Sequence, residues 1–262
     1  MKKVPWILTV SCLLFVLAFG GCARPEVGPE LVDRSGEGVI KLPVRHQIVG
    51  RSVQGRPIMC QVFGEGPDVV LIMGTIHGDE PAGTPLVRCL SGYLKENPYL
   101  LDGRMVVLMP LTNPDGRVLG TRENARGVDL NRNFDASNRI DNTRNGREAL
   151  SEPESRVIRD MIQRYRPNRI VSLHQRRNGR PSCIDYDGPA DSLAQHMARY
   201  CDVPVSRLGM YPGSLGSYMA TRLGIPVITF EMFESDSRLT AAVLWQRYGR
   251  AMLAAIVYPN DL

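Results

Sequence analysis

This sequence of 262 residues has no strong excess of charge, no internal repeat and no linker-like stretch within its later part. It contains 32 basic and 27 acidic residues, an excess too small to indicate a protein that binds nucleic acid. Its amino-terminal apolar run is somewhat short for a transmembrane helix, which needs ~20 residues. Beyond that run, the length fits one large domain or two small ones.

The first 22 residues have the layout of a secretory signal. A basic start, Met1-Lys-Lys3, precedes an apolar stretch over residues 4–19, and Gly20-Gly-Cys22 closes the segment. A cysteine directly after small residues resembles the bacterial lipoprotein signal, and this predicts a lipid on Cys22. Phe19 is unusual three places before such a cysteine. Cleavage by ordinary signal peptidase and an uncleaved anchor therefore stay open as alternatives.

Residues 23–45 are predicted to be a flexible tether, because they are rich in proline, glycine and charge. We expect an exported protein at the periplasmic face of a bacterial membrane, with its main folded domain in residues 46–262. Export permits disulfides, but the sequence leaves the pairing of the four later cysteines open. These cysteines are Cys60, Cys89, Cys183 and Cys201.

Short apolar runs alternate with helical patterns through the rest of the chain. The apolar runs, typical of strands buried on both faces, cover residues 58–63, 69–73, 105–109, 170–173 and 227–230. The helical patterns cover residues 81–95, 151–165, 190–200, 214–223 and 239–257. Ser151-Glu-Pro-Glu154 is predicted to be a capping box at the start of its helix. The alternation predicts an α/β fold, with a parallel or mixed sheet between helices.

Three candidate metal ligands follow predicted strands. His77 and Glu80 come just after one strand, in a segment with several glycines, and His174 ends another strand. Ligands of such sheets gather beyond the carboxyl ends of the strands, so we expect these side chains at one rim. Two imidazoles and a carboxylate leave a tetrahedral zinc one open position for water. The pattern therefore predicts one zinc ion held by these three residues.

The other parts of a metal-assisted amide hydrolase are also present. Glu231 ends an apolar run, where burial raises the pKa of a carboxyl group toward the range useful for a general base. Arg122 and the pair Asn131 and Arg132 are candidates for stabilising an oxyanion and holding a substrate carboxylate. Taken singly, Glu231 also fits a structural ion pair, and the pair fits a solvated turn. Asn113-Pro-Asp-Gly116 has the chemistry of a turn, with a positioning role.

The order of these motifs resembles that of the zinc metallocarboxypeptidases. The segments that carry the resemblance are His77-Gly-Asp-Glu80, Asn113-Pro-Asp-Gly116, Gly127-Val-Asp-Leu-Asn-Arg-Asn133, Ser151-Glu-Pro-Glu154, Ser172-Leu-His174 and Thr229-Phe-Glu231. Within that family the chain is most similar to the bacterial murein peptide amidases, which cut the γ-D-glutamyl-diaminopimelate bond. Cys183-Ile-Asp185 and Tyr211-Pro-Gly-Ser-Leu-Gly-Ser217 resemble that subgroup in particular. The resemblance implies a single domain with a mixed, mainly eight-stranded sheet between helices.

The resemblance also implies a role for each site residue. It implies zinc ligation by His77, Glu80 and His174. It further implies a catalytic glutamate at Glu231, an arginine polarising the scissile carbonyl at Arg122, carboxylate binding by Asn131 and Arg132, and a mobile tyrosine at Tyr211. The implied substrate is a murein peptide. Diaminopimelate carries two carboxylates and an amine. A pocket lined by arginine, with acids such as Asp185 and Asp187 nearby, would suit it.

One segment departs from the family pattern. Arg176-Arg-Asn-Gly-Arg180 lengthens and charges the loop after His174. We interpret this loop either as a grip for a second carboxylate of an acidic peptide or as a solvated surface loop.

Two other functions stay open at this point. One is a zinc deacylase of N-acyl amino acids, similar to the succinylglutamate desuccinylase and aspartoacylase group. The other is a lipoprotein that binds wall peptides without cutting them. Asn113-Pro-Asp-Gly116 and Ser151-Glu-Pro-Glu154 favour the peptidase over the deacylase, and the complete set of ligands with Glu231 favours an enzyme over a binding protein. The oligomeric state is left open.

Overall fold

The computed structural model describes residues 44–262. The predicted signal over residues 1–22, and all of the predicted tether except its last two residues, lie outside the described residues. In the described part of the chain, no helix is long and apolar enough to cross a membrane.

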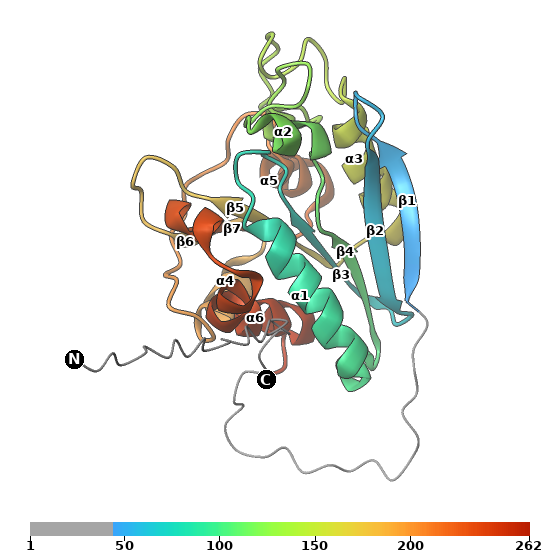
Figure 1. The fold of residues 1–262 in the computed structure, drawn as a ribbon, viewed down its shortest axis with the longest axis vertical. Helices are drawn as coiled ribbons and strands as arrows, with labels where there is room; N and C mark the ends of the chain where they lie inside the picture. The colour runs from blue at the N-terminus through green and yellow to red at the C-terminus, as the bar shows by residue number, and fades with distance from the viewer. Residues whose placement is uncertain (1–43) are drawn as a thin grey trace, which may run out of the picture. The chain divides into compact units, whose positions relative to one another are not determined.

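Seven strands in residues 44–262 form one mixed sheet with the order β1-β2-β4-β3-β5-β7-β6 (Figure 1). The strands are β1 (Arg45–Arg51), β2 (Pro57–Gly64), β3 (Asp68–Gly74), β4 (Arg104–Met109), β5 (Arg169–Gln175), β6 (Cys183–Asp187) and β7 (Val227–Met232). The four central strands β4, β3, β5 and β7 are parallel. The outer pairs β1–β2, β2–β4 and β6–β7 are antiparallel.

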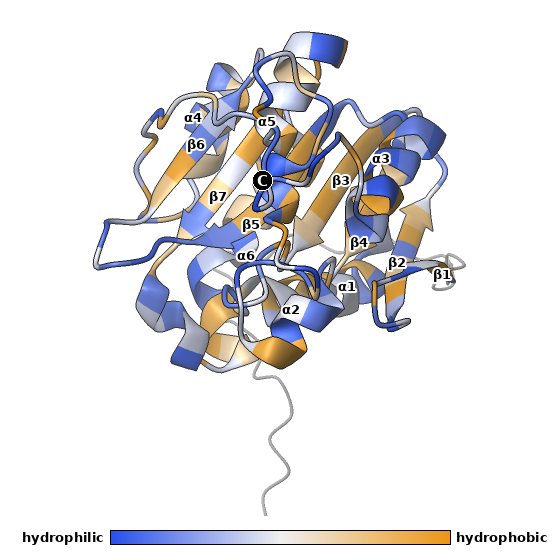
Figure 2. Ribbon diagram, turned by 90° about the horizontal axis from the view of Figure 1, so that it is seen from above, coloured by the Kyte–Doolittle hydropathy of each residue, from blue (hydrophilic) through white to orange (hydrophobic). Residues whose placement is uncertain are grey.

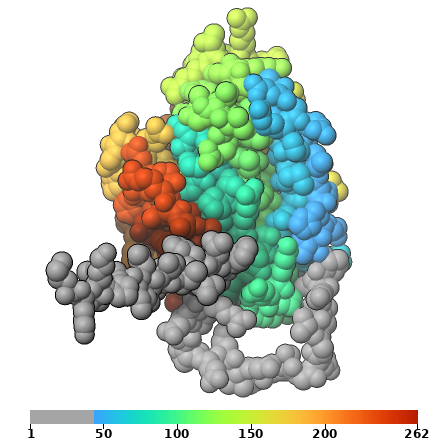
Figure 3. All heavy atoms as spheres, viewed as in Figure 1, coloured from blue at the N-terminus to red at the C-terminus, as the bar shows by residue number. Residues whose placement is uncertain are grey.

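Helices cover both faces of this sheet. On one face lie α1 (Gly83–Glu96), α4 (Asp191–Ala198) and α6 (Ala241–Val257). On the other face lie α3 (Pro153–Tyr165) and α5 (Leu215–Tyr218), which continues as a π-helical turn over Met219–Leu223. Short 3-10 helices occur at Pro98–Leu101, Leu130–Arg132 and Glu234–Arg238, and α2 (Pro114–Leu119) follows β4. Figure 3 shows α1 at the surface between the strands β1–β2 and the carboxyl-terminal part of the chain.

The strands are buried on both sides, and their alternate residues enter different cores. In β3, Val70 and Ile72 belong to the core that includes residues of α1, α4 and α6, whereas Leu71 and Met73 belong to the core that includes residues of α3 and α5. Figure 2 shows β3 as hydrophobic along its length. This two-sided burial is why an uninterrupted apolar run, rather than an alternating one, predicts such a strand.

The predicted α/β architecture is confirmed, and all five predicted strands and five predicted helices form. The sheet has seven strands in the described residues, whereas the resemblance implies mainly eight. Beyond β6, the chain around Val205 makes only an isolated parallel bridge with Ile184. Its neighbour Pro204 has no N–H to donate, and this limits pairing at that edge.

Two local predictions are corrected by the structure. Ser151 does not form a capping box: the residue before α3 is Glu152, and no side chain caps this helix. Ser151 instead bonds Asn133 and Glu152. Asn113-Pro-Asp-Gly116 is the first turn of α2 rather than an isolated turn, with Asn113 accepting from the Gly116 N–H at 2.9 Å. Each segment nevertheless makes a contact with a distant part of the chain, Ser151 with Asn133 and Asn113 with Ile76.

Candidate metal centre and substrate pocket

The loop after β3 carries two of the three candidate ligands, His77 and Glu80. It is held against α2, because the Asn113 amide donates to the Ile76 carbonyl at 3.1 Å. Gly78 lies so close to the α2 backbone that a Cβ there would be 1.9 Å from the carbonyl carbon of Gly116. Only glycine permits this approach. The loop is thereby fixed with both ligand side chains turned toward the end of β5.

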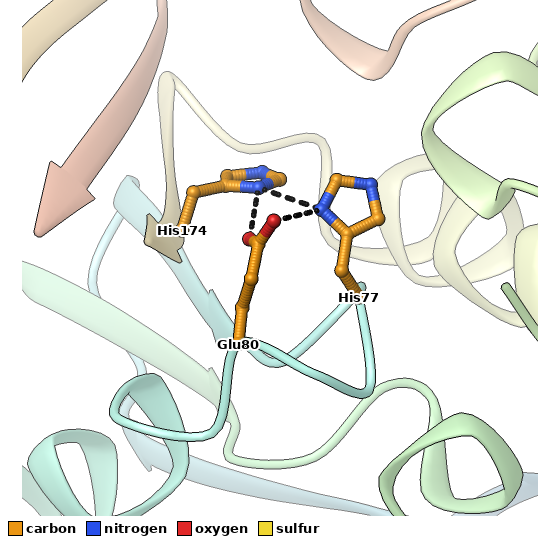
Figure 4. A group of neighbouring side chains, drawn as sticks. All are labelled: His77, Glu80 and His174. Atoms are coloured by element: carbon orange, nitrogen blue, oxygen red, sulfur yellow. Dashed lines mark hydrogen bonds and ion pairs between the residues drawn. The ribbon is translucent and has the colours of Figure 1, made fainter. Parts of the chain in front are cut away.

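The ligand atoms of His77, Glu80 and His174 converge on one point (Figure 4). The two histidine Nδ1 atoms are 3.2 Å apart, and each is 2.9–3.0 Å from an oxygen of Glu80. Ligands bound to zinc at ~2.0–2.1 Å in a tetrahedral arrangement are themselves roughly 3.3 Å apart. All three residues are buried. Donor type, spacing and burial therefore fit a zinc ion.

Further contacts orient the ligands. Nε2 of His77 lies 3.1 Å from Asp129 Oδ1, and Nε2 of His174 lies 3.0 Å from Ser172 Oγ. Hydrogens on these outer nitrogens leave the Nδ1 lone pairs to face the metal position. The backbone N–H of Gln175 donates to Glu80 Oε2 at 3.1 Å, and this fixes the carboxylate.

The charges in this cluster favour a cation. Burial opposes a charge on His77, but the carboxylates of Glu80 and Asp129 outweigh it and raise the pKa of His77 to about 9. Burial likewise opposes a charge on Glu80, yet the neighbouring histidines hold its pKa well below the usual range. The same negative charges that attract a proton also attract a divalent metal ion.

Arg122 is brought to the metal centre by two ion pairs. Its Nη1 donates to Glu80 Oε1 at 3.0 Å, and its Nε donates to Asp129 Oδ2 at 2.9 Å. The side chain is 27% exposed and lines the pocket. Asp129 thus fixes both His77 and Arg122, so a single carboxylate sets the relative position of a ligand and a cation.

Glu231 lies on β7 directly beside His174 of β5, because the two residues are register partners. It lines the same pocket. Burial raises the pKa of the Glu231 carboxyl group, and the nearby His174 lowers it only in part. A carboxyl group with a raised pKa beside a metal position is suited to taking a proton from water and returning it.

Asn131, Arg132 and Tyr211 are grouped at another wall of the pocket. The side-chain oxygen of Asn131 accepts from the Leu215 N–H at 2.9 Å, and this leaves its amide N–H groups as donors. The Arg132 guanidinium lies 4.8 Å from the centre of the Tyr211 ring. Tyr211 is 41% exposed, as befits a side chain at the rim. The structure brings together every residue assigned to the site from sequence.

The pocket has a volume of about 600 Å³ and lies over β5, β7 and β6, on the face covered by α3 and α5. Thr229, Asp185 and Asp187 form part of its floor. Burial raises the pKa of Asp187 to about 6, with a contribution from the like charge of Asp185. Asp187 Oδ1 is buried and has no hydrogen-bond partner among the described residues.

The sequence profile of the zinc carboxypeptidase family matches residues 42–180. Murein peptide amidase A of Escherichia coli (strain K12) is 32% identical over 201 residues, which are 70% of this chain and 78% of that protein. The chain belongs to the zinc carboxypeptidase family. It is accordingly a metallopeptidase or amidase, and the cluster of His77, Glu80 and His174 is its candidate zinc site.

Other members of the family extend the likeness. Murein peptide amidase A of Vibrio campbellii is 29% identical over 81% of this chain and 88% of that protein. The crystal structure of murein-tripeptide amidase MpaA from Escherichia coli O157 matches with a TM-score of 0.64 at 28% identity. That match covers 84% of this chain and 95% of that one. Carboxypeptidase A from Helicoverpa armigera has a TM-score of 0.66 at 22% identity, which shows the fold alone.

Several functional contacts of this zinc carboxypeptidase were not found from sequence. Asp129 lies in one of the segments that carry the family resemblance, but nothing local in the sequence indicates its contact with His77, 52 residues away. Ser172 sits beside His174 as an ordinary strand residue, and Gln175 acts through its backbone. Such roles arise from tertiary contacts, which no local pattern reports.

Proposed function

We propose that this protein hydrolyses murein peptides at the γ-D-glutamyl-diaminopimelate bond, using one zinc ion. The proposal is supported by the relatives named murein peptide amidase, and one observation of the pocket carries it. Donors for a carboxylate, Asn131 and Arg132, line a pocket whose floor also presents Asp187 with a buried oxygen that has no partner among the described residues. Diaminopimelate offers a carboxylate to the first group and an ammonium to the second.

Asp187 also disfavours ordinary apolar carboxyl-terminal residues. A leucine or phenylalanine side chain on this floor would enclose the Asp187 carboxylate without supplying a donor, and an unpaired buried polar group is costly. The Gly216 backbone packs directly against this carboxylate, because a Cβ at Gly216 would lie 1.9 Å from Asp187 Oδ2. A substrate ammonium is the group that best completes this end of the pocket.

The chemistry follows from the residues around the metal centre. A bound zinc ion supplies Lewis acidity, which lowers the pKa of water and polarises a carbonyl group. Glu231 takes a proton from the attacking water and delivers it to the leaving amine. Arg122 donates to the carbonyl oxygen as negative charge develops on it. Asn131 and Arg132 hold the substrate carboxylate, and Tyr211 closes the rim.

Export and anchoring are part of the proposal and rest on residues 1–22. The basic start, the apolar stretch and Cys22 support a lipid-anchored protein at the periplasmic face of a bacterial membrane. Labelling cells with a fatty-acid probe tests this: wild type should carry the label, and Cys22→Ala should not. Equal labelling of the two proteins would count against lipidation at Cys22.

A substrate panel tests the assignment against its rivals. We expect the full chain to release diaminopimelate from L-Ala-γ-D-Glu-diaminopimelate. We expect much slower release of phenylalanine from a blocked dipeptide and of glutamate from N-succinylglutamate. Preference for the dipeptide would make the protein an ordinary carboxypeptidase, and preference for N-succinylglutamate would make it a deacylase. Binding of the tripeptide without cleavage, by protein that carries zinc, would indicate a binding protein.

A further inference from the structure

Arg176 lies on the opposite side of the metal centre from Asp187. Ser172 and His174 on β5, and Arg176 directly after that strand, are spaced two residues apart, and all three line the pocket. The register pairs His174 with Glu231, and β6 residue Asp187 with Val227, four residues before Glu231. Two residues along a strand span roughly 7 Å. The floor of the pocket therefore runs from Asp187, past the metal ligands, to Arg176.

Other residues of the loop hold Arg176 in place. Its backbone N–H continues the strand ladder by donating to the Met232 carbonyl at 2.8 Å. The next residue, Arg177, pairs with Asp79 at 2.7 Å, and the Gly179 N–H donates to Glu234 at 3.3 Å. The segment Arg176-Arg-Asn-Gly-Arg180 is therefore tied to the ligand loop and to the turn after β7. It is more than a freely solvated loop.

The side chain of Arg176 has a buried donor without a partner among the described residues. This donor is Nε, which has no hydrogen-bond partner within residues 44–262. Burial raises the pKa of both Glu231 and Asp185, and the positive charge of Arg176 lowers each in part, which places that charge near both groups. A buried N–H donor without a partner is costly unless a ligand completes it.

We propose that Arg176 binds a carboxylate of the substrate residue on the acyl side of the scissile bond. Given the proposed function, on which this inference rests, the leaving diaminopimelate occupies the Asp187 end, so the acyl residue extends toward Arg176. A γ-linked D-glutamate keeps its α-carboxylate free, a few bonds from the scissile carbonyl. The planar fork of arginine binds a carboxylate through two hydrogen bonds. Arg176 thereby selects a γ-linked acidic residue over a neutral one.

Two tripeptides that differ in one group test this inference. The first is L-Ala-γ-D-Glu-diaminopimelate, and the second has D-isoglutamine in place of D-glutamate, so that the α-carboxylate becomes a carboxamide. For the wild-type chain, we expect kcat/KM to favour the carboxylate peptide by roughly 10- to 100-fold. Arg176→Gln should lose that preference, so that its kcat/KM values for the carboxylate and carboxamide peptides become about equal. Arg176→Lys should keep part of the preference.

The controls separate this inference from folding and from the proposed function. Arg88→Gln, an exposed change on α1 outside the pocket, should leave both rates unchanged. A wild-type preference that survives in Arg176→Gln would overturn the inference. If neither tripeptide is cleaved, the proposed function fails. The same preference is then measured on blocked Glu-Phe and Gln-Phe dipeptides, where its loss in Arg176→Gln supports the inference and its persistence overturns it.

Discussion

Replacing Asp129 with alanine removes one carboxylate that holds two parts of the site at once. Asp129 accepts from His77 Nε2 at 3.1 Å, from Arg122 Nε at 2.9 Å and from the Asn131 N–H at 3.0 Å. Without it, the outer nitrogen of His77 has lost its acceptor and the ring is less firmly oriented. Loss of a contact that orients a metal ligand typically lowers metal affinity by about 10- to 100-fold.

That loss can be read from thermal unfolding without any activity assay. A 10- to 100-fold weaker Kd corresponds to about 1.4–2.7 kcal/mol less stabilisation by saturating zinc. In a domain of this size each kcal/mol changes Tm by about 2–4 °C. The zinc-induced rise in Tm should therefore be smaller in Asp129→Ala by roughly 3–10 °C.

The comparison includes a milder variant and a control. Asp129→Asn keeps an oxygen acceptor for His77, so its effect should be smaller. Asp160→Ala changes an exposed acid on α3 and should behave as wild type. A zinc-induced rise in Tm that is the same in Asp129→Ala and wild type, together with equal zinc affinity in a chelator competition, would refute the proposed link between Asp129 and the metal centre.

Three further predictions concern catalysis, packing and pH. Glu231→Gln should lower kcat by about 10²–10⁴ at unchanged zinc content; activity within twofold of wild type would exclude Glu231 as the base. Gly216→Ala places a Cβ 1.9 Å from Asp187 Oδ2 and should raise KM for the tripeptide by displacing that carboxylate. The control Gly92→Ala, where the Cβ meets nothing within 4 Å, should leave KM unchanged. Equal KM values for the two variants would contradict a role for the contact between Gly216 and Asp187. The folded-state pKa of Asp187 is raised to about 6, above its value of about 4 in the unfolded chain. Its contribution to stability is therefore fully present below pH ~4 and is lost as pH rises through ~6. In wild type, relative to Asp187→Asn, the free energy of unfolding should fall across this interval by up to ~3 kcal/mol; parallel pH profiles from urea unfolding would contradict the shift.

The central strands and the metal ligands could be predicted because both have strong local patterns. The runs that became β3 and β4 are apolar on both faces, and His77 and Glu80 follow such a run within a glycine-rich segment. Because the carboxyl ends of parallel strands meet at one edge of the sheet, His77 and Glu80 are then expected to lie close to His174. These inferences needed no knowledge of contacts between distant residues.

Polar strands and long-range contacts could not be predicted in the same way. β6 reads Cys-Ile-Asp-Tyr-Asp, and its apolar pattern is interrupted because Asp185 and Asp187 face the pocket. Ser151 fits a capping box by spacing, but its hydroxyl bonds Asn133, which is 18 residues away. The ties that hold Arg176 reach Met232 and, through Arg177, Asp79. Local pattern therefore found the ligands themselves but missed the polar strand and the distant contacts that support them.

Release of free diaminopimelate from L-Ala-γ-D-Glu-diaminopimelate, followed by mass spectrometry, tests the central claim most directly. The purified full chain is assayed as isolated, after treatment with a chelator, and after zinc is restored. The account predicts release that stops with the chelator and returns with about one zinc per chain. Release that persists in metal-free protein, or an intact tripeptide after incubation with fully zinc-loaded protein, would contradict it.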